Sequence, residues 1–451
     1  MPSTSDGAPR ALSGWGRATR SVASVVRPAT ADDVVTAFAR ATGATADRGF
    51  LPRGLGRAYG DAAQNAGGRV LDMTALHGID EFDERAGRIT AGAGVSIAAL
   101  AAHTLARGWF PAVVPGTRWV TVGGAIAADI HGKNHHADGG FADHVASLEL
   151  VTPHGERRTV TREGDPGAWA ASVGGMGLSG AIVRATLDLV AVRSPLVREE
   201  LARTTDLDDL LARMSRDDRA HRYSVAWVDG AHTRGRGILM QGDHAGETGP
   251  PRELSPPRLR APRWVPGNLF GRTTVRAFDA LWFHVKPRVR RTDLVPLASF
   301  FWPLDGVQGW NRLYGGRGLV QHQCVVPHGR EDVLHAILAS ARRARIAPTL
   351  AVLKRLGPAT RDAPLSFPIA GWTLALDLPA GARGLATLVD GWDERVAAAG
   401  GRVYLAKDAR MRPEAVKAMY PRLDAWRAAR AKLDPHGVMR SDLARRLELA
   451  P

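Results

Sequence analysis

Apolar and polar residues along positions 1–194 are spaced as expected for short strands, glycine-rich turns and few helices. Apolar residues at helical spacing, closed by Gly108, predict an amphipathic helix over 96–108, and residues 147–161 predict a hairpin that turns at 153–155. Continuous or alternating apolar runs predict strands over 69–76, 87–95 and 180–192. Strands and helices do not alternate regularly, so the pattern favours an α+β fold over a doubly wound parallel sheet.

Residues 195–401 predict a second domain. A charged helical stretch opens it, and a strand follows over 222–230. Further strands with alternating polarity are predicted over 300–306, 319–329, 348–358 and 367–379. Helices over 329–345 and 384–399 separate some of these strands, which indicates an antiparallel sheet with helices on one face. The last segment, 402–451, is mostly helical.

The composition is that of a soluble globular protein, with 45% hydrophobic and 23% charged residues in 451. The single cysteine, Cys324, excludes an intrachain disulfide and zinc sites built from several cysteines. The N-terminus has no apolar core typical of a secretory signal, and no apolar stretch is long enough to span a membrane. We therefore expect a soluble or peripherally membrane-associated protein, located in the cytoplasm or in the cell envelope.

The net charge of +15 indicates an anionic partner, and it is concentrated in one segment. Positions 252–291 hold ten basic and two acidic residues, within a Pro/Arg-rich stretch, 245–291, that predicts a mobile loop. The same segment carries aromatic residues, namely Trp264, Phe270, Phe278, Trp282 and Phe283. Basic residues mixed with aromatic ones suit a membrane interface, and a solvated loop over the active site explains them equally well. No nucleic-acid-binding module accompanies the charge, so we expect no nucleic-acid partner.

Three glycine-rich turns follow one another at intervals of about 60 residues: PRGLGRAYGDAAQN (52–65), a turn within 115–136, and VGGMGLSG (173–180). Glycines allow positive φ and a close backbone approach, and successive N–H groups in such turns hold phosphates. The first turn matches neither the Rossmann fingerprint nor the P-loop. Three such turns in one domain indicate a long ligand wrapped by several loops, as a dinucleotide would be.

The stretch ADIHGKNHH (128–136) raises the question of a metal site, because it holds three histidines. His131 and His135 have the i, i+4 spacing of helical metal ligands, but Gly132 and Asn134 oppose a helix there. Asp129 is the one acidic side chain nearby. We therefore expect no metal, and assign His135 and His136 to holding the shape of the loop.

The order of these motifs resembles a known family. RGLGRAYGD, then PGTRWVTVGGAIAADIHGKNHH, then GGMGLSG is similar to the FAD-binding domain of the vanillyl-alcohol oxidase/p-cresol methylhydroxylase superfamily. DIHGKNHH and YLAKD (404–408) resemble the subgroup of that superfamily that oxidises decaprenylphosphoryl ribose. The resemblance extends over nearly the whole chain. It implies that 1–194 binds FAD, that 195–401 binds substrate, and that 402–451 returns to the FAD domain.

Carried over position by position, the resemblance implies FAD contacts along all three turns. The residues are Arg53, Gly54, Leu55, Gly56, Arg57, Ala58, Tyr59, Gly60, Asp61, Gly116, Thr121, Val122, Gly123, Gly124, Ala128, Asp129, Ile130, His131, Ile182 and Tyr404. Many relatives bond the flavin covalently through a histidine of the first loop, and Arg57 stands at that position here. We therefore predict dissociable FAD, with Arg57 placing its charge near the pyrophosphate.

The resemblance also implies a set of substrate-side residues. Lys407 matches the family's essential lysine, and His131 is expected to touch flavin or substrate. The further pocket positions are Lys133, Trp227, Tyr314, Gln321, Gln323, Lys354, Thr373 and Ala375. The two glutamines are spaced i, i+2, so that both side chains face one side of a strand. Relatives sensitive to covalent inhibitors have asparagine and cysteine where this chain has Thr373 and Ala375.

The implied activity is FAD-dependent oxidation of the 2′-hydroxyl of a polyprenylphosphoryl ribose, completed by a nicotinamide-dependent reductase. An aldonolactone or alditol oxidase of the same superfamily is the nearest alternative. A basic membrane- or nucleic-acid-binding protein with a vestigial flavin fold is the alternative from another class.

Overall fold

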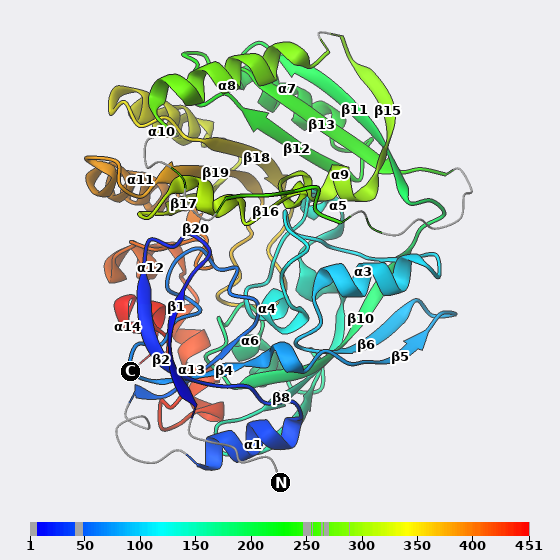
Figure 1. Ribbon diagram of the computed structural model, residues 1–451, viewed down its shortest axis with the longest axis vertical. Helices are drawn as coiled ribbons and strands as arrows, with labels where there is room; N and C mark the ends of the chain where they lie inside the picture. The colour runs from blue at the N-terminus through cyan, green and yellow to red at the C-terminus, as the bar shows by residue number, and fades with distance from the viewer. Residues whose placement is uncertain are drawn as a thin grey trace.

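Three β-sheets organise the chain in the computed structural model, which describes residues 7–40, 48–246, 254, 256–262, 265, 270–287 and 289–450. Two smaller sheets form the lower half of the molecule in Figure 1, and one large sheet forms the upper half. Both chain ends lie in the lower half. The mixed helices and sheets confirm the predicted α+β class.

The smallest of the three is a mixed four-stranded sheet in the order β1 (Ala8–Ser13), β2 (Arg20–Val26), β4 (Arg69–Asp72) and β3 (Phe50–Arg53). Helix α1 (Ala31–Ala39) begins at a capping box in which Thr30 and Asp33 satisfy each other's backbone N–H groups. The strand predicted over 69–76 is shorter than expected, because Asp72 accepts from the Thr74 N–H and starts a 3₁₀ turn, η1 (Met73–Ala75).

The second sheet is antiparallel, in the order β5 (Ile79–Asp83), β6 (Arg88–Gly92), β10 (Ala181–Ala191), β8 (Val145–Val151) and β9 (Arg157–Val160), with β7 (Trp109–Pro111) also on β10. The predicted strands at 87–95 and 180–192, the helix and the hairpin are confirmed. The helix is α3 (Ile97–Leu105), capped by the Ser96 hydroxyl. The remaining short helices are α4 (Val122–Ala127), α5 (His135–Asp138), η2 (Phe141–His144) and α6 (Pro166–Ser172).

The large sheet has eight antiparallel strands. In order they are β15 (Arg291–Pro296), β11 (Leu196–Thr204), β13 (Gly237–His244), β12 (Tyr223–Val228), β18 (Leu350–Leu356), β19 (Gly371–Pro379), β17 (Leu319–Pro327) and β20 (Arg402–Val403). The strands predicted at 222–230, 319–329, 348–358 and 367–379 are confirmed. The charged opening stretch is only partly helical, because strand β11 precedes α7 (Leu207–Asp217). The strand predicted at 300–306 is wrong: α9 (Leu297–Phe301) and η3 (Pro303–Gly306) occupy it, and Phe300 and Phe301 are buried as helical neighbours.

Helices cover both faces of the large sheet, which corrects the prediction of helices on one face. Helices α7, α10 (Glu331–Arg343) and α11 (Leu385–Ala398) bury their apolar sides against one face. On the opposite face, Phe283 of α8 (Arg272–Val285) packs with Trp227 and Ile238. Successive strand residues point to opposite faces, so Trp227 faces α8 while Ala226 and Val228 face α7.

The prediction of a loop over 245–291 is corrected by α8, a 14-residue helix, and by the short pair β14 (Leu259–Arg260) and β16 (Val307–Gln308). A further 3₁₀ helix, η4 (Trp310–Tyr314), leads back to the large sheet. Of the residues counted in the basic segment, Arg252, Glu253, Arg263, Trp264 and Arg288 lie outside the described residues, as does the side chain of Arg272.

The C-terminal segment packs against the N-terminal strands rather than ending beside the large sheet (Figure 1). It forms α12 (Pro413–Met419), α13 (Leu423–Leu433) and α14 (Asp442–Arg446). Phe50 donates its N–H to Val438 O at 2.9 Å and accepts from the Arg440 N–H at 2.8 Å. Arg446 of α14 binds both carboxylate oxygens of Asp61, at 2.7 and 2.9 Å, which fixes the end of the first glycine-rich loop.

Candidate active site

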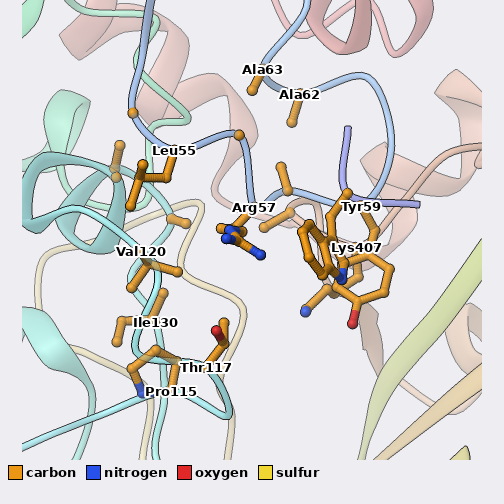
Figure 2. Close-up of a pocket in the computed structure, with 18 of the residues that line it drawn as sticks. Leu55, Arg57, Tyr59, Ala62, Ala63, Pro115, Thr117, Val120, Ile130 and Lys407 are labelled. Carbon is orange, nitrogen blue, oxygen red and sulfur yellow. The ribbon is translucent and has the colours of Figure 1, made fainter. Parts of the chain in front are cut away.

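A cleft lies where the glycine-rich turns meet the face of the large sheet that is opposite α7, α10 and α11. It encloses about 1770 Å³, open solvent at its mouth included. All three glycine-rich turns contribute lining residues, and strands β17, β18 and β19 contribute side chains from one face. Figure 2 shows the first loop with Leu55, Arg57 and Tyr59 on one side, and Pro115, Val120 and Ile130 of the second turn facing it.

The first loop is held by its own arginine and approaches the second turn very closely. The guanidinium of Arg53 donates to Ala63 O across the loop and to Ser13 O at 2.8 Å. A Cβ at Gly54 would lie 2.2 Å from Thr121 Oγ1, so no larger residue fits without separating the two turns. Gly56 has φ +63°, which favours glycine and tightens the loop. These positions explain why the turns are built from glycine.

Arg57 places a cation in the middle of the cleft (Figure 2). Its guanidinium carbon lies 3.9 Å from the ring centroid of Trp15. Its buried Nε has no hydrogen-bond partner among the described residues. Burial lowers the pKa of Arg57, and the nearby carboxylate of Asp305 opposes that change. The arginine stays charged at neutral pH, so the cleft presents a donor and a positive charge suited to an anionic ligand.

His131 lies at the sheet end of the cleft, beside the stacked rings of Phe367 and Tyr404, whose centroids are each 5.3 Å away. Gln323 donates from Nε2 to His131 Nε2 at 2.8 Å, which places the imidazole hydrogen on Nδ1. Nδ1 is buried and has no partner among the described residues. Burial, together with Lys354, His135 and Lys407, holds the pKa of His131 well below its usual range. A neutral imidazole therefore offers an N–H donor there.

Two lysines reach this end of the cleft from different elements. Lys354 of β18 donates to Gly132 O at 3.4 Å, and burial together with Lys407 lowers its pKa to about 7. Lys407, which follows β20, lies with its Nζ 3.9 Å from the ring centroid of Tyr59. Burial lowers the pKa of Lys407 to about 8. Two amines near neutrality can each gain or release a proton under ordinary conditions.

Asp377 of β19 is a buried carboxylate that acts electrostatically on Lys407. It lies opposite Gln321 in the strand register and accepts a hydrogen bond from the Gln321 amide. Its other oxygen, Oδ2, has no partner among the described residues. Burial raises the pKa of Asp377 to about 6, and Lys407 opposes the rise. In return, the carboxylate raises the pKa of Lys407 against the effect of burial.

Most of the residues predicted from the sequence do line this one cleft. On the cofactor side they are Arg53 to Tyr59, Gly116, Thr121, Gly123, Gly124, Ala128, Ile130, His131, Ile182 and Tyr404. On the substrate side they are Gln321, Gln323, Lys354, Ala375 and Lys407. Both glutamines project from the same face of β17, as their spacing predicts, while His322 between them pairs with Asp393 on the other face.

Four of the predicted cofactor residues, Gly60, Asp61, Val122 and Asp129, do not line the cleft. Asp61 is turned toward Arg446. Val122 is fully buried, and a Cβ at Gly60 would lie 1.9 Å from Asp408 O, so both positions serve packing. Asp129 accepts from the Ser366 hydroxyl and from the Ala142 N–H at 3.2 Å.

Four predicted substrate residues, Lys133, Trp227, Tyr314 and Thr373, are also outside the lining. Lys133 donates to Phe300 O, and Trp227 packs under α8. The Tyr314 hydroxyl bonds to Thr349, at a second hollow beside the cleft. Thr373 does not reach the surface of the cleft, and its hydroxyl accepts a hydrogen bond from the Gln323 amide at 3.1 Å.

Sequence reasoning missed several lining residues, above all Trp15 and Trp310, whose rings meet edge to face at 5.7 Å. It also missed Asp377. The LSGWGR motif contains Trp15 and was the available signal for it. Asp377 alternates with Thr373 and Ala375 along one strand face, so the period of two could have found it.

The three histidines of the 128–136 stretch diverge. His135 Nδ1 accepts from the Gly357 N–H at 3.0 Å, and His136 Nε2 bonds to the carbonyls of Asp218 and His221. These bonds attach the stretch to the large sheet and to the turn before β12. Within the described part of the chain, no group of three or more His, Cys, Asp or Glu side chains is placed to hold a metal ion.

Comparison with known proteins identifies the class. A family model for an FAD binding domain matches residues 22–161, and one for D-arabinono-1,4-lactone oxidase matches residues 388–447. The chain is an FAD-dependent oxidoreductase, as its motifs predict. The decaprenylphosphoryl-β-D-ribose oxidase of Mycolicibacterium smegmatis is 41% identical over 97% of this chain and 97% of its own length. This chain belongs to the family of that oxidase, which confirms the predicted superfamily and contradicts the alternative of a non-enzymatic binding protein.

Two further relatives match smaller parts of the chain. An uncharacterised protein in the mprA 5′ region of Streptomyces coelicolor is 43% identical over 79% of this chain and all of its own length. Cytokinin dehydrogenase 6 of Oryza sativa is 27% identical over 40% of this chain and 36% of its own.

The residues of the cleft fit FAD. Gly54 lets the first turn approach the Thr121 side chain of the second turn closely, and Arg57 offers a donor without a partner among the described residues and a charge for a pyrophosphate. His131 Nδ1–H is a second buried donor without a protein partner among the described residues. The cleft thus supplies what a long ligand with a flat ring system and an anionic centre requires.

We expect the FAD to be released by denaturation, because the first loop carries Arg57 where a covalent bond would need a nucleophile. Among the described residues that line the cleft, His131 is the only histidine and there is no cysteine. Acid precipitation should leave the yellow flavin in the supernatant. Flavin retained in the pellet, and lost again in His131→Ala, would instead show attachment at His131.

Proposed function

We propose that this chain oxidises the 2′-hydroxyl of decaprenylphosphoryl-β-D-ribose to a ketone, the first half of an epimerisation that yields the arabinose donor for cell-wall arabinan. The main support for the proposal is that four polar side chains meet at the sheet end of the cleft, namely those of Gln321, Gln323, Lys407 and His131. Full-length similarity to the oxidase of that name supports it. In this assignment residues 1–194 and 402–451 hold FAD, and 195–401 bind the sugar.

The reaction removes a hydride from the carbinol carbon and a proton from its hydroxyl, and bound FAD would supply the hydride acceptor. The amides of Gln321 and Gln323 would orient the sugar hydroxyls from one strand face. Lys407, with a pKa of about 8, would receive the hydroxyl proton or hold a positive charge beside the reacting atoms. The neutral His131 would fix the ring system through its Nδ1–H.

Two partners follow from this activity. A ketone product must be reduced again to complete an epimerisation, so we propose a separate NAD(P)-dependent short-chain reductase. A polyprenyl chain resides in a bilayer, so we propose peripheral contact with a membrane. No helix within the described residues has the length and apolarity needed to cross one.

An oxidase of a free aldonolactone or alditol is the second candidate, favoured by the match of residues 388–447 to the arabinonolactone oxidase family. The test is anaerobic reduction of the bound flavin, which is measured as the loss of its visible absorbance. A short-chain prenylphosphoryl ribose in detergent should bleach the flavin, whereas D-arabinono-1,4-lactone and free alditols should not. Bleaching by the lactone or an alditol, with none by the prenylphosphoryl ribose, would reverse the assignment.

A further inference from the structure

Helix α8 carries apolar residues on two sides: Val275 and Phe283 pack inward, and a second apolar stripe is turned to solvent. Phe278, Leu281, Trp282 and Val285 stand at i, i+3, i+4 and i+7, and their exposed fractions are 57, 64, 38 and 62%. We call these four residues the outer stripe. The buried side of the helix includes Asp279, which is only 2% exposed. A surface helix ordinarily turns its apolar stripe to the core, so the outer stripe is a face without a partner among the residues that the structure describes.

Cations flank the outer stripe. Lys286 Nζ lies 4.2 Å from the ring centroid of Trp282, and Trp282 stacks on Phe278 with centroids 6.3 Å apart. Arg276 is exposed on the same helix. The surrounding sequence, 252–291, holds ten basic and two acidic residues. Aromatic rings beside cations suit the boundary between anionic headgroups and acyl chains.

The inner side of α8 packs on the same face of the large sheet that lines the cleft. Phe283 packs into the cluster that contains Trp227 and Leu350, and Leu350 also lines the cleft. The helix lies along the outside of the large sheet at the top of Figure 1. The outer stripe therefore lies on a helix that packs on the same sheet face as the substrate side of the cleft.

We propose that the outer stripe of α8 is the surface by which this protein docks on an anionic phospholipid membrane, with the helix lying in the interface plane. The inference rests on the proposed lipid-linked substrate, whose prenyl chain would then stay in the bilayer while its sugar enters the cleft beside α8. A second protein is disfavoured as the occupant, because a helix of 14 residues is about 21 Å long. A single stripe of four side chains on such a helix offers less surface than the roughly 800 Å² that each partner buries in a stable protein interface.

Vesicle binding by the FAD-loaded full chain tests this directly. The protein should sediment with vesicles of phosphatidylglycerol and phosphatidylcholine, more weakly with phosphatidylcholine alone, and less as salt rises. The triple variant Phe278→Ser/Leu281→Ser/Trp282→Ser should bind the anionic vesicles at least tenfold more weakly. Val22→Ser is the matched control, because Val22 is 57% exposed on β2, outside this surface, and its loss should leave binding unchanged.

The same variants in detergent separate this inference from the proposed function. Flavin bleaching by a short-chain prenylphosphoryl ribose should be equal in the triple variant and the parent, because the outer stripe does not line the cleft. Equal vesicle binding by parent and triple variant would overturn the docking surface. The docking surface would also be overturned if the parent protein did not bind vesicles but used the outer stripe to self-associate or to bind another protein. Absence of bleaching in both proteins would instead count against the proposed function alone.

Discussion

Replacement of Lys407 by alanine is expected to slow anaerobic reduction of the flavin by substrate about 10²- to 10⁴-fold, the usual range for loss of a positioned acid–base group. Lys407 lies at the sheet end of the cleft beside Tyr59, with a pKa that burial lowers to about 8. Alanine leaves neither a proton acceptor nor a charge there. Stopped-flow absorbance after mixing with the prenylphosphoryl ribose measures the rate constant.

The variant should still bind FAD, because alanine removes only the contact with the Tyr59 ring and leaves the Arg53 hydrogen bonds of the first turn and the close approach of Gly54 to Thr121. Lys417→Ala on the exposed side of α12 is the matched control, and its rate should equal that of the parent. The proposed role of Lys407 would be wrong if the Lys407→Ala enzyme held FAD and its flavin were bleached within about threefold of the parent rate.

The parts of the fold that were predictable from the sequence are those set by local physics. The helix at 96–108 is confirmed because its Ser96 cap, its apolar spacing and its closing Gly108 lie within one short stretch. The faces of Gln321 and Gln323 follow from the period of two along a strand. The positions of the glycine-rich turns were equally predictable, since only glycine leaves room for the Thr121 side chain beside position 54.

The errors arise where a distant partner decides the outcome. Asp61 belongs to the first glycine-rich turn, yet Arg446, 385 residues later, turns its carboxylate away from the cleft. Strand β11 carries charged residues that suit a helix, but pairing with β13 and β15 makes it extended. The Pro/Arg-rich composition of 245–291 predicted a loop, but residues 272–285 contain no proline and form α8.

Lys407 and Asp377 differ in what the residue pattern and the family resemblance could each predict about them. Taken alone, a lysine after a strand is more often exposed, so Lys407 was singled out by the YLAKD motif rather than by any spacing. Asp377 belongs to no quoted motif and stands in a run of apolar residues. Its importance depends on which side chains β17 and the segment after β20 bring to it, and only the assembled sheet shows that.

Replacement of Asp377 by asparagine is expected to move the pH dependence of flavin reduction to lower pH. The Asp377 carboxylate raises the pKa of Lys407, while burial lowers it to about 8. Asparagine can still accept the hydrogen bond from Gln321 but carries no charge. Lys407 would then lose its proton at a lower pH than in the parent. On the sloping part of the profile, a pKa lower by about one changes the rate at a fixed pH about tenfold.

The shape of the profile also decides what Lys407 does. If the neutral amine takes the hydroxyl proton, the rate rises with pH, and the rising limb moves to lower pH in Asp377→Asn. If the protonated amine stabilises negative charge, the rate falls with pH, and the falling limb moves in the same direction. Asp424→Asn on the exposed side of α13 is the control for loss of one carboxylate. A folded, FAD-loaded Asp377→Asn enzyme with an unmoved profile would show that this carboxylate does not set the protonation of Lys407.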